Sequence, residues 1–471
     1  MKALLSIFIF ITISLSATSQ NYFWNHYGGE FDDVAYDVQQ TSDLGFVLSG
    51  RSGVSVPELG SGLYMVKTDS EGNEEWSQTY LDTDVELGSC VHQTADLGYI
   101  VSGFTDGNVF DGSTFSLTKL NSEGVEEWTK EYDLLTFGLG ENLIITEDDG
   151  FIITGHVVVD SYQQIKVIKT DNQGNVIWSQ IYESEFDQFA ESIVRTNDGG
   201  YAVCGDSGNY VGSDVILLKI DENGELIWDE FFVGNGGEAE CFSLDTTSDN
   251  GFVIYGTSIF TDEEVSNKCL LIKTDSEGIQ EWQETYYTLD GASGRGVKAV
   301  GNNGYIMTGY AIDNTQQVYL MYCIKTDPLG STEWEQIFVE SQTSRGRSCT
   351  ITQDGGFAFA GSANITDITY QAYLVKTNSS GTLNISSPES TRSKTSVYPN
   401  PFSNSATIFL SLSADKRFDL QVLDSHGKIV RSLENVPYRH TFDRGKLNSG
   451  IYYYKVLEDG SFYDSGKFII Q

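Results

Sequence analysis

One ten-residue stretch recurs along the chain at a nearly constant spacing, and this repeat limits the possible folds more than any other feature. The stretch reads KTDSEGNEEW, from Lys67 to Trp76. Five more complete copies begin at Lys119, Lys169, Lys219, Lys273 and Lys325. A seventh copy, KTNSSGTLNI from Lys376, ends at Ile385 in place of tryptophan. The first and last lysines are 309 positions apart (376 − 67), so the six steps average 51.5 residues. A fixed period of about 50 residues is typical of repeat architectures.

A second motif runs in phase with the first. It reads TSDLGF at Thr41, and further copies begin at Thr94, Thr146, Thr196, Thr247, Val300 and Thr352. Each unit divides into four short β-like segments, which in the second unit are SCVHQTA, GYIVSGF, FSLTKLN and EEWTKEY. The repeats show no helical periodicity. Four strands in a unit of about 50 residues predict a β-propeller; tandem sandwiches are the alternative, but such a unit is too short for a sandwich core.

The missing tryptophan predicts how the array closes. Trp24 lies in YFWNHYGG, before the first lysine motif. We expect this N-terminal strand to join the last unit, so that Trp24 replaces the side chain that Ile385 does not supply. Such an exchange removes two exposed sheet edges. The predicted fold is all-β: a seven-bladed β-propeller of four-stranded blades at residues 20–385, closed by the N-terminal strand.

The lysine motif itself is predicted to be a turn between the third and fourth strands. Its Asp accepts backbone N–H groups and its Gly supplies a positive φ angle. DNQGN and DENGE partly resemble the start of calcium loops, but they lack the remaining ligands, so the turn is favoured. We expect the motif lysine to form an exposed ion pair, contributing about 0–1 kcal/mol, with the aspartate of the second motif. These aspartates are Asp43, Asp96, Asp148, Asp198, Asp249 and Asp354.

The N-terminus predicts export. Lys2, an apolar run from Ala3 to Leu15 and the small residues Ala17 and Ser19 indicate a signal peptide at residues 1–19. No other apolar run approaches the roughly 18–20 residues of a transmembrane helix. Segment 391–471 carries 11 Lys and Arg against 8 Asp and Glu, so the rest of the chain carries 17 of the 28 basic and 59 of the 67 acidic residues. Because this main body is strongly negative, it repels nucleic acid and anionic lipid. We expect a soluble monomer.

Cysteines and histidines give no chemical motif. The six cysteines are interpreted as buried small hydrophobic residues, with Cys204 and Cys241, expected in adjoining repeats, as the one candidate disulfide. There is no CxxC pair, and the histidines have no motif spacing, so neither a metal nor another cofactor is predicted. GxSxG, HExxH and phosphate-binding glycine loops do not occur. Catalysis is therefore not predicted, although a glycosidase-type carboxylate pair stays open.

The predicted binding surface follows from the order of the strands. Loops between the second and third strands, and the crossovers between blades, vary in sequence, and both must lie on one face. The first strand of each blade should line a central channel. Five residues before each copy of the second motif, a ring is expected from Tyr36, Ser89, Glu141, Glu191, Phe242, Arg295 and Arg347. Arg295, Arg345 and Arg347 either hold a carboxylate or phosphate, or pair with the acids of the ring.

The composition changes after the last repeat. Residues 386–395 read as a Ser/Thr-rich linker, and residues 396–471 contain the strand-like segments ATIFLSLS, FDLQVLD, KIVRSLE, GIYYYKVLEDG and GKFIIQ. This module carries SVYPNPF, then VLDSHGKIV, then LNSGIYYYKV and a last strand with a lysine. The residues of these motifs are Tyr398, Pro399, Asn400, Pro401, Gly427, Gly450, Tyr452 and Lys467.

In these motifs the module resembles the type A sorting domain of the type IX secretion system. The resemblance implies an immunoglobulin-like β-sandwich that carries the export signal across the outer membrane of Bacteroidota, with the secretion machinery as partner. Cleavage and attachment to the cell surface or release usually follow in that family. The repeats resemble secreted seven-bladed propeller repeats of the same phylum.

Three classes of function are compatible with the sequence. The first is a binding or adhesion module that recognises a glycan or protein through its variable face. The second is a structural surface component, and the third is a polysaccharide-active enzyme. The absence of catalytic motifs favours the binding module over the enzyme.

Overall fold

The structure is a computed structural model that describes residues 22–29, 31–53, 61–80, 85–106, 113–132, 139–209, 212–234, 237–260, 267–338, 343–366, 369–383, 395–398, 402–410, 417–424, 428–437, 439–458 and 461–470. The predicted signal peptide, residues 386–394 of the predicted linker, and Ile385, Pro399, Asn400, Pro401 and Gly427 lie outside these ranges. So do the centres of several variable loops, at 54–60, 107–112 and 261–266. Regular structure in the described ranges is entirely β-strand.

Each repeat forms a four-stranded antiparallel sheet. The first sheet contains β2 (Asp33–Gln40), β3 (Phe46–Gly53), β4 (Ser61–Thr68) and β5 (Glu74–Tyr80). The second contains β6 (Val85–Gln93), β7 (Tyr99–Asp106), β8 (Ser113–Leu120) and β9 (Glu126–Tyr132). The third contains β10 (Leu139–Ile145), β11 (Phe151–Val159), β12 (Tyr162–Thr170) and β13 (Val176–Tyr182). The fourth contains β14 (Asp187–Arg195), β15 (Tyr201–Asn209), β16 (Gly212–Ile220) and β17 (Leu226–Phe232).

The remaining repeats follow the same plan. The fifth sheet contains β18 (Gly237–Thr246), β19 (Phe252–Phe260), β20 (Asn267–Thr274) and β21 (Gln280–Tyr286). The sixth contains β22 (Gly291–Ala299), β23 (Tyr305–Asp313), β24 (Val318–Thr326) and β25 (Thr332–Phe338). The last contains β26 (Thr343–Ile351), β27 (Phe357–Thr366), β28 (Thr369–Thr377) and, from the other end of the chain, β1 (Phe23–Tyr27).

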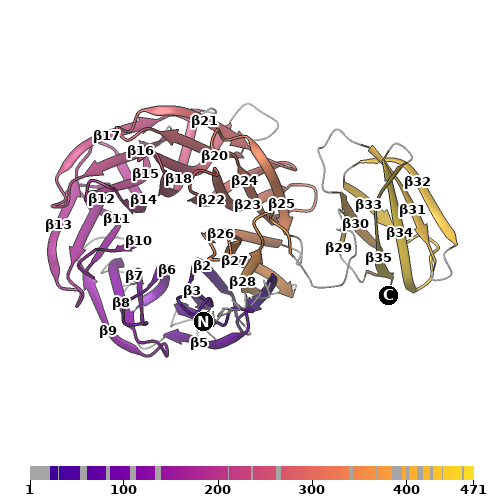
Figure 1. The fold of residues 1–471 in the computed structure, drawn as a ribbon, viewed down its shortest axis with the longest axis horizontal. Coiled ribbons are helices and arrows are strands. Elements are labelled where there is room, and N and C mark those ends of the chain that lie inside the picture. The colour runs from indigo at the N-terminus through magenta and orange to yellow at the C-terminus, as the bar shows by residue number, and fades with distance from the viewer. Residues whose placement is uncertain are drawn as a thin grey trace, which may run out of the picture.

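The sheets are arranged around a common centre (Figure 1), with β2, β6, β10, β14, β18, β22 and β26 innermost. Each of these strands contacts the innermost strand of the next sheet, and β26 contacts β2. Hydrophobic clusters fill the spaces between neighbouring sheets. The fold is therefore all-β, with the repeated four-stranded antiparallel sheets that are characteristic of propellers.

The N-terminal strand pairs with β28, but one residue out of the predicted position. Phe23 lies opposite Lys376, and Trp24 lies opposite Val375. In the first sheet it is Lys67 that lies opposite Trp76. Phe23 therefore takes the place of the missing tryptophan, and the prediction for Trp24 is wrong. Successive residues of a strand point to opposite faces, so Trp24 turns outward and is 36% exposed.

The repeated tryptophan covers the glycine turn of the next sheet. A Cβ atom on Gly124 would lie 2.9 Å from the ring of Trp76, and one on Gly72 would lie 2.2 Å from the ring of Phe23. Tyr27 also donates its hydroxyl to the carbonyl of Gly72 at 2.7 Å, as the tyrosine that ends the fourth strand does in other sheets. The tryptophan thus recurs because it packs one sheet against the next.

The predicted turn geometry of the lysine motif is confirmed. Asp171 accepts the backbone N–H groups of Gln173 at 2.9 Å and Asn175 at 2.8 Å, so its carboxylate is already used within the DNQGN turn. The turn glycine has a positive φ in all seven copies, as predicted. These are Gly72, Gly124, Gly174, Gly224, Gly278, Gly330 and Gly381.

The motif lysines form ion pairs, but they are buried rather than exposed. Lys67 Nζ lies 2.9 Å from Asp43 and 2.8 Å from Glu75, and its side chain is only 4% exposed. The aspartate predicted from the second motif pairs with its lysine in five repeats, at Asp43, Asp96, Asp198, Asp249 and Asp354. The described residues show no such pair for Asp148. The glutamates that add a second carboxylate were not predicted.

A disulfide joins Cys204 of β15 to Cys241 of β18, with the Cα atoms 6.7 Å apart. It links the fourth and fifth sheets, which confirms the candidate pairing. Cys90, Cys269, Cys323 and Cys349 are buried free thiols, as their interpretation as small hydrophobic residues predicts.

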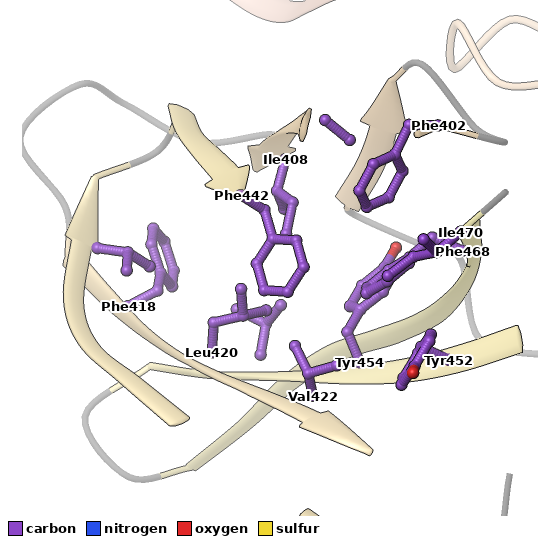
Figure 2. Close-up of a cluster of buried hydrophobic side chains, with 13 residues drawn as sticks. Phe402, Ile408, Phe418, Leu420, Val422, Phe442, Tyr452, Tyr454, Phe468 and Ile470 are labelled. Atoms are coloured by element: carbon purple, nitrogen blue, oxygen red, sulfur yellow. The ribbon is translucent and has the colours of Figure 1, made fainter. Parts of the chain in front are cut away.

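The C-terminal module has two antiparallel sheets around one core (Figure 2). The first contains β29 (Thr395–Tyr398), β30 (Ser405–Leu410) and β33 (Arg439–Asp443), and the second contains β31 (Arg417–Leu423), β32 (Ile429–Pro437), β34 (Gly450–Glu458) and β35 (Ser461–Ile470). Phe468 lies at the centre of this core, with its ring 5.2 Å from that of Phe442 and 5.5 Å from that of Phe402. The five predicted strands are present; β29 and β33 were not predicted.

Candidate ligand-binding site

Every residue of the predicted ring is the extra residue of a β-bulge. In β2 the register shifts between Ala35 and Asp37, which leaves Tyr36 without a partner in β3. The same shift occurs in the other innermost strands, at Ser89, Glu141, Glu191, Phe242, Arg295 and Arg347. A bulge kinks its strand and redirects the side chain of the extra residue. The fold thus presents one redirected residue per sheet to the centre.

A glycine on the second strand makes room for each bulge. A Cβ atom on Gly50 would lie 1.8 Å from the carbonyl oxygen of Val34, and one on Gly361 would lie 1.8 Å from that of Arg345. Equivalent close approaches occur at Gly103, Gly205, Gly256 and Gly309. This glycine recurs in the sequence, in SGR, SGF, CGD, YGT, TGY and AGS, so a signal for the bulges was present.

Six ring residues line one cavity of about 600 Å³. They are Tyr36, Ser89, Glu191, Phe242, Arg295 and Arg347. The seventh, Glu141, lies in β10, and its side chain is outside the described part of the structure. The periodicity of the sequence therefore located a set of side chains that the fold brings together.

The two ring arginines stack on aromatic rings of neighbouring sheets. The guanidinium carbon of Arg295 lies 3.7 Å from the ring centre of Phe242, and that of Arg347 lies 5.2 Å from the ring centre of Tyr36. Among the described residues, neither arginine forms an ion pair with a carboxylate. Burial lowers the pKa of Arg347, and the nearby positive charges of Arg295 and Arg345 lower it further. The expected pairing of these arginines with ring acids stays a prediction, because the side chain of Glu141 lies outside the described part of the structure.

Charged side chains of both signs stand three positions further along the innermost strands. Lys298 of β22 and Asp245 of β18 line the same cavity. Burial alone would lower the pKa of Lys298, but Asp245 and Asp37 hold it above its ordinary value. Asp37 also accepts the Ser348 hydroxyl at 2.6 Å and the Val91 N–H at 3.0 Å.

One buried carboxyl lies near the arginines and was not predicted. The pKa of Asp206 is raised to about 7, mainly by burial and also by the charge of Glu240, although the Cys241 N–H at 2.6 Å and the charge of Arg295 act to lower it. Asp206 follows the bulge glycine Gly205, a position that differs in every repeat. That variability gave no signal by which sequence reasoning could select it.

No group of three or more His, Cys, Asp or Glu side chains in the described ranges is placed to hold a metal ion. The same ranges contain no helix that is long and apolar enough to cross a membrane.

The sorting motif is spread over the C-terminal module. Tyr398 ends β29, and Gly450 begins β34. Tyr452 is buried, stacks on Phe468 and donates its hydroxyl to the carbonyl of Asn448 at 2.9 Å. Lys467 is exposed on β35, opposite Tyr453.

Comparison with family models matches residues 396–471 to the secretion system C-terminal sorting domain. The resemblance of this module to a type IX sorting domain is thereby confirmed. The protein is secreted across the outer membrane, to the cell surface or the extracellular space.

No curated protein matches the sequence. Among solved structures, similar chains include PorZ, an essential surface component of the type IX secretion system of Porphyromonas gingivalis (12% identity, 94% of this chain and 61% of that chain, TM-score 0.42). A protein of unknown function from Dyadobacter fermentans is 9% identical over 75% of this chain and 98% of that chain, with a TM-score of 0.43. The extracellular domain of a two-component system from B. thetaiotaomicron is 11% identical over 94% and 58% of the two chains, with a TM-score of 0.42. The chain thus spans about three fifths of the length of PorZ.

Proposed function

We propose that the protein is an exported, monomeric binding protein of the cell surface or extracellular space. In this proposal, residues 20–385 form a closed seven-bladed β-propeller, residues 386–395 a linker, and residues 396–471 an immunoglobulin-like sandwich that directs export. Seven four-stranded sheets and the pairing of β1 with β28 support the closed propeller. The ligand binds where the ring residues line the central cavity.

One observation carries the binding proposal: Arg295 and Arg347 line the cavity without a carboxylate partner among the described residues. This is unusual in a chain with 28 Lys and Arg against 67 Asp and Glu, where acids are abundant. Aromatic rings hold the two guanidinium groups, and their free edges suit a carboxylate or phosphate, which accepts two parallel hydrogen bonds. The ligand therefore carries an anionic group.

The remaining ring residues suit a glycan. Ser89 and Glu191 line the cavity beside the two aromatic rings, and Glu141 completes the ring in this proposal. Cavities of roughly 300–1,000 Å³ hold small ligands, with a few polar groups fixing orientation. Hydroxyl and carboxyl groups bind sugar hydroxyls, and the arginines bind an acidic substituent of the sugar.

A glycan array probed with the full chain tests this proposal. We expect binding to glycans that carry uronic or other acidic sugars, and loss of that signal in Arg295→Ala/Arg347→Ala. Lys130→Gln removes one positive charge on the outer strand β9 and serves as the control, with binding retained. Unchanged binding by the double variant would discard the arginine site.

The polysaccharide-active enzyme is the second candidate, because a carboxyl with a pKa of about 7 suits a general acid. Asp206 would donate the proton and a second carboxylate would assist, as glycoside hydrolysis requires. Hydrolysis of a polysaccharide by the full chain, abolished in Asp206→Asn, would establish this activity. Binding without turnover favours the binding protein.

A further inference from the structure

Two tyrosines of the sixth sheet extend the arginine site away from the ring. Tyr310 of β23 and Tyr319 of β24 lie edge to face, with ring centres 5.1 Å apart. Arg345 of β26 lies 4.2 Å from the ring centre of Tyr319 and 5.6 Å from that of Tyr310. On the other side, Arg295 Nη2 donates to the Tyr310 hydroxyl at 3.3 Å. The tyrosine pair thus connects the ring to a third arginine.

The three guanidinium groups are close enough to act on one small molecule. Arg295 and Arg345 both lie 5.6 Å from the ring centre of Tyr310, so their guanidinium carbons are at most 11.2 Å apart, twice that distance. Arg347 stands two residues after Arg345 on β26 and lines the same cavity as Arg295. A ligand of two linked rings spans such a distance.

This cluster of like charges is not neutralised by the described residues. The Nε atoms of Arg295, Arg345 and Arg347 are buried and have no hydrogen-bond partner. A desolvated donor without a partner, beside like charges, is unfavourable unless an anion joins it. The motif lysines differ: Lys273, for example, lies 2.9 Å from both Asp249 and Glu281. The motif lysines are thus paired with carboxylates, whereas the described residues form no ion pair with these three arginines.

We propose that Arg345, with Tyr310 and Tyr319, forms a second oxyanion subsite beside the ring, so that the preferred ligand is a small molecule with two anionic groups. This inference rests on the proposed function and specifies its ligand. Stacking covers the faces of the guanidinium groups and leaves their edges for two separate oxyanions. The net charge of −39 disfavours a long polyanion. The two groups are carboxylates, as in a uronic acid disaccharide, or phosphates.

Calorimetric titration of the full chain with galacturonate, digalacturonate and inorganic pyrophosphate tests the second subsite. At fixed ionic strength, we expect digalacturonate or pyrophosphate to bind at least tenfold more tightly than galacturonate, and the tighter of the two identifies carboxylate or phosphate as the source. Arg345→Ala should remove this advantage and leave galacturonate affinity unchanged. Arg345→Lys, which keeps the charge but not the planar fork, should retain part of it.

Two controls keep the outcomes separate. Lys130→Gln reports the effect of one lost charge far from the cavity, and thermal unfolding shows that each variant is folded; if Arg345→Ala does not fold, Arg345→Lys decides. Two results overturn the second subsite while the binding proposal stands. In the first, wild type binds ligands with one and with two anionic groups equally tightly. In the second, Arg345→Ala still binds the ligand with two anionic groups more tightly. No binding of any probe to wild type contradicts the anion site itself.

Discussion

Ile227 occupies a position at which four other sheets carry glutamate. Those residues, Glu75, Glu127, Glu281 and Glu333, each pair with the buried lysine of their motif. Among the described residues, Lys219, the lysine of the fourth repeat, pairs with Asp198 alone, at 2.9 Å. The side chain of Ile227 is instead 55% exposed. A single residue type at this position therefore decides whether a buried ammonium has one carboxylate or two.

Ile227→Glu should stabilise the protein by about 0.5 kcal/mol, because it adds a second carboxylate to a buried lysine at little cost in desolvation. The free energy of unfolding, measured by denaturant titration at pH 7, checks this. Ile227→Gln is the matched control, as it adds a polar side chain of the same length without charge. Equal stability of the Glu and Gln variants would show that the ion pair is not formed.

The ring and the motif lysines were predictable at the residue scale, because they stand at fixed distances from a repeated motif. Tyr310 and Asp206 were not, because their position, directly after the bulge glycine, carries a different residue in each repeat. Tyr319 was not either, because its position also varies among the repeats. Trp24 was predicted instead of its neighbour Phe23. The two residues are adjacent in sequence, but their side chains point to opposite faces of the sheet, so an error of one position selects the wrong face.

At the scale of the strand, the β-bulge is the feature that turns the side chain of a strand residue toward the cavity. Alternation of polar and apolar residues predicted the strands, and the lysine–tryptophan spacing predicted their turns. Alternation alone does not reveal an inserted residue, so the bulges were not predicted. The glycine opposite each bulge, such as Gly361, could have revealed them.

Gly361→Ala should destabilise the protein by about 2 kcal/mol or more and weaken anion binding, because the new Cβ atom would lie 1.8 Å from the carbonyl oxygen of Arg345 and displace the bulge that holds Arg347. Denaturant unfolding and titration with galacturonate measure the two effects. Gly29→Ala, where a Cβ atom meets nothing within 4 Å, is the control. A Gly361 variant as stable as this control would mean that the bulge is not required.

For the whole molecule, acidic residues tie stability to pH in two directions. Burial opposes ionisation of Asp96, Asp198 and Asp249, but hydrogen bonds from threonine and lysine prevail and lower each pKa to about 2. The unfolded chain, with ordinary aspartate pKa values near 4, therefore binds more protons between pH 2 and pH 4. Stability from these groups is complete above that window and is lost as the pH falls through it.

We expect the thermal midpoint to fall steeply between pH 4 and pH 2, and to fall less in Asp249→Asn. Asp206 acts in the opposite sense: its folded pKa of about 7 lies above the unfolded value, so the stability that it provides at low pH is lost as the pH rises from about 4 to 7. The stability of Asp206→Asn, measured relative to wild type at the same pH, should therefore be higher at pH 8 than at pH 5. A constant difference from wild type across that range would contradict the assigned ionisation.

Most of the domain organisation of the chain could be predicted from its sequence. Seven copies of each motif gave the number of sheets, and the sorting motifs gave the family of the C-terminal module and hence export. The ligand could not be predicted from the sequence, because the ring positions vary among the repeats and match no ligand-binding motif. The pairing of Cys204 with Cys241 followed only from their expected places in adjoining repeats.

The central claim is that β1 completes the last sheet, so that the innermost strands surround one cavity. Disulfide cross-linking tests it most directly, with Trp24→Cys combined with Val375→Cys, its partner in the antiparallel register. Leu218→Cys, the matching position in the fourth sheet, replaces Val375→Cys in the control pair. The account predicts a linked peptide joining positions 24 and 375 after mild oxidation, and none joining 24 and 218. A folded double variant without the 24–375 link would contradict it.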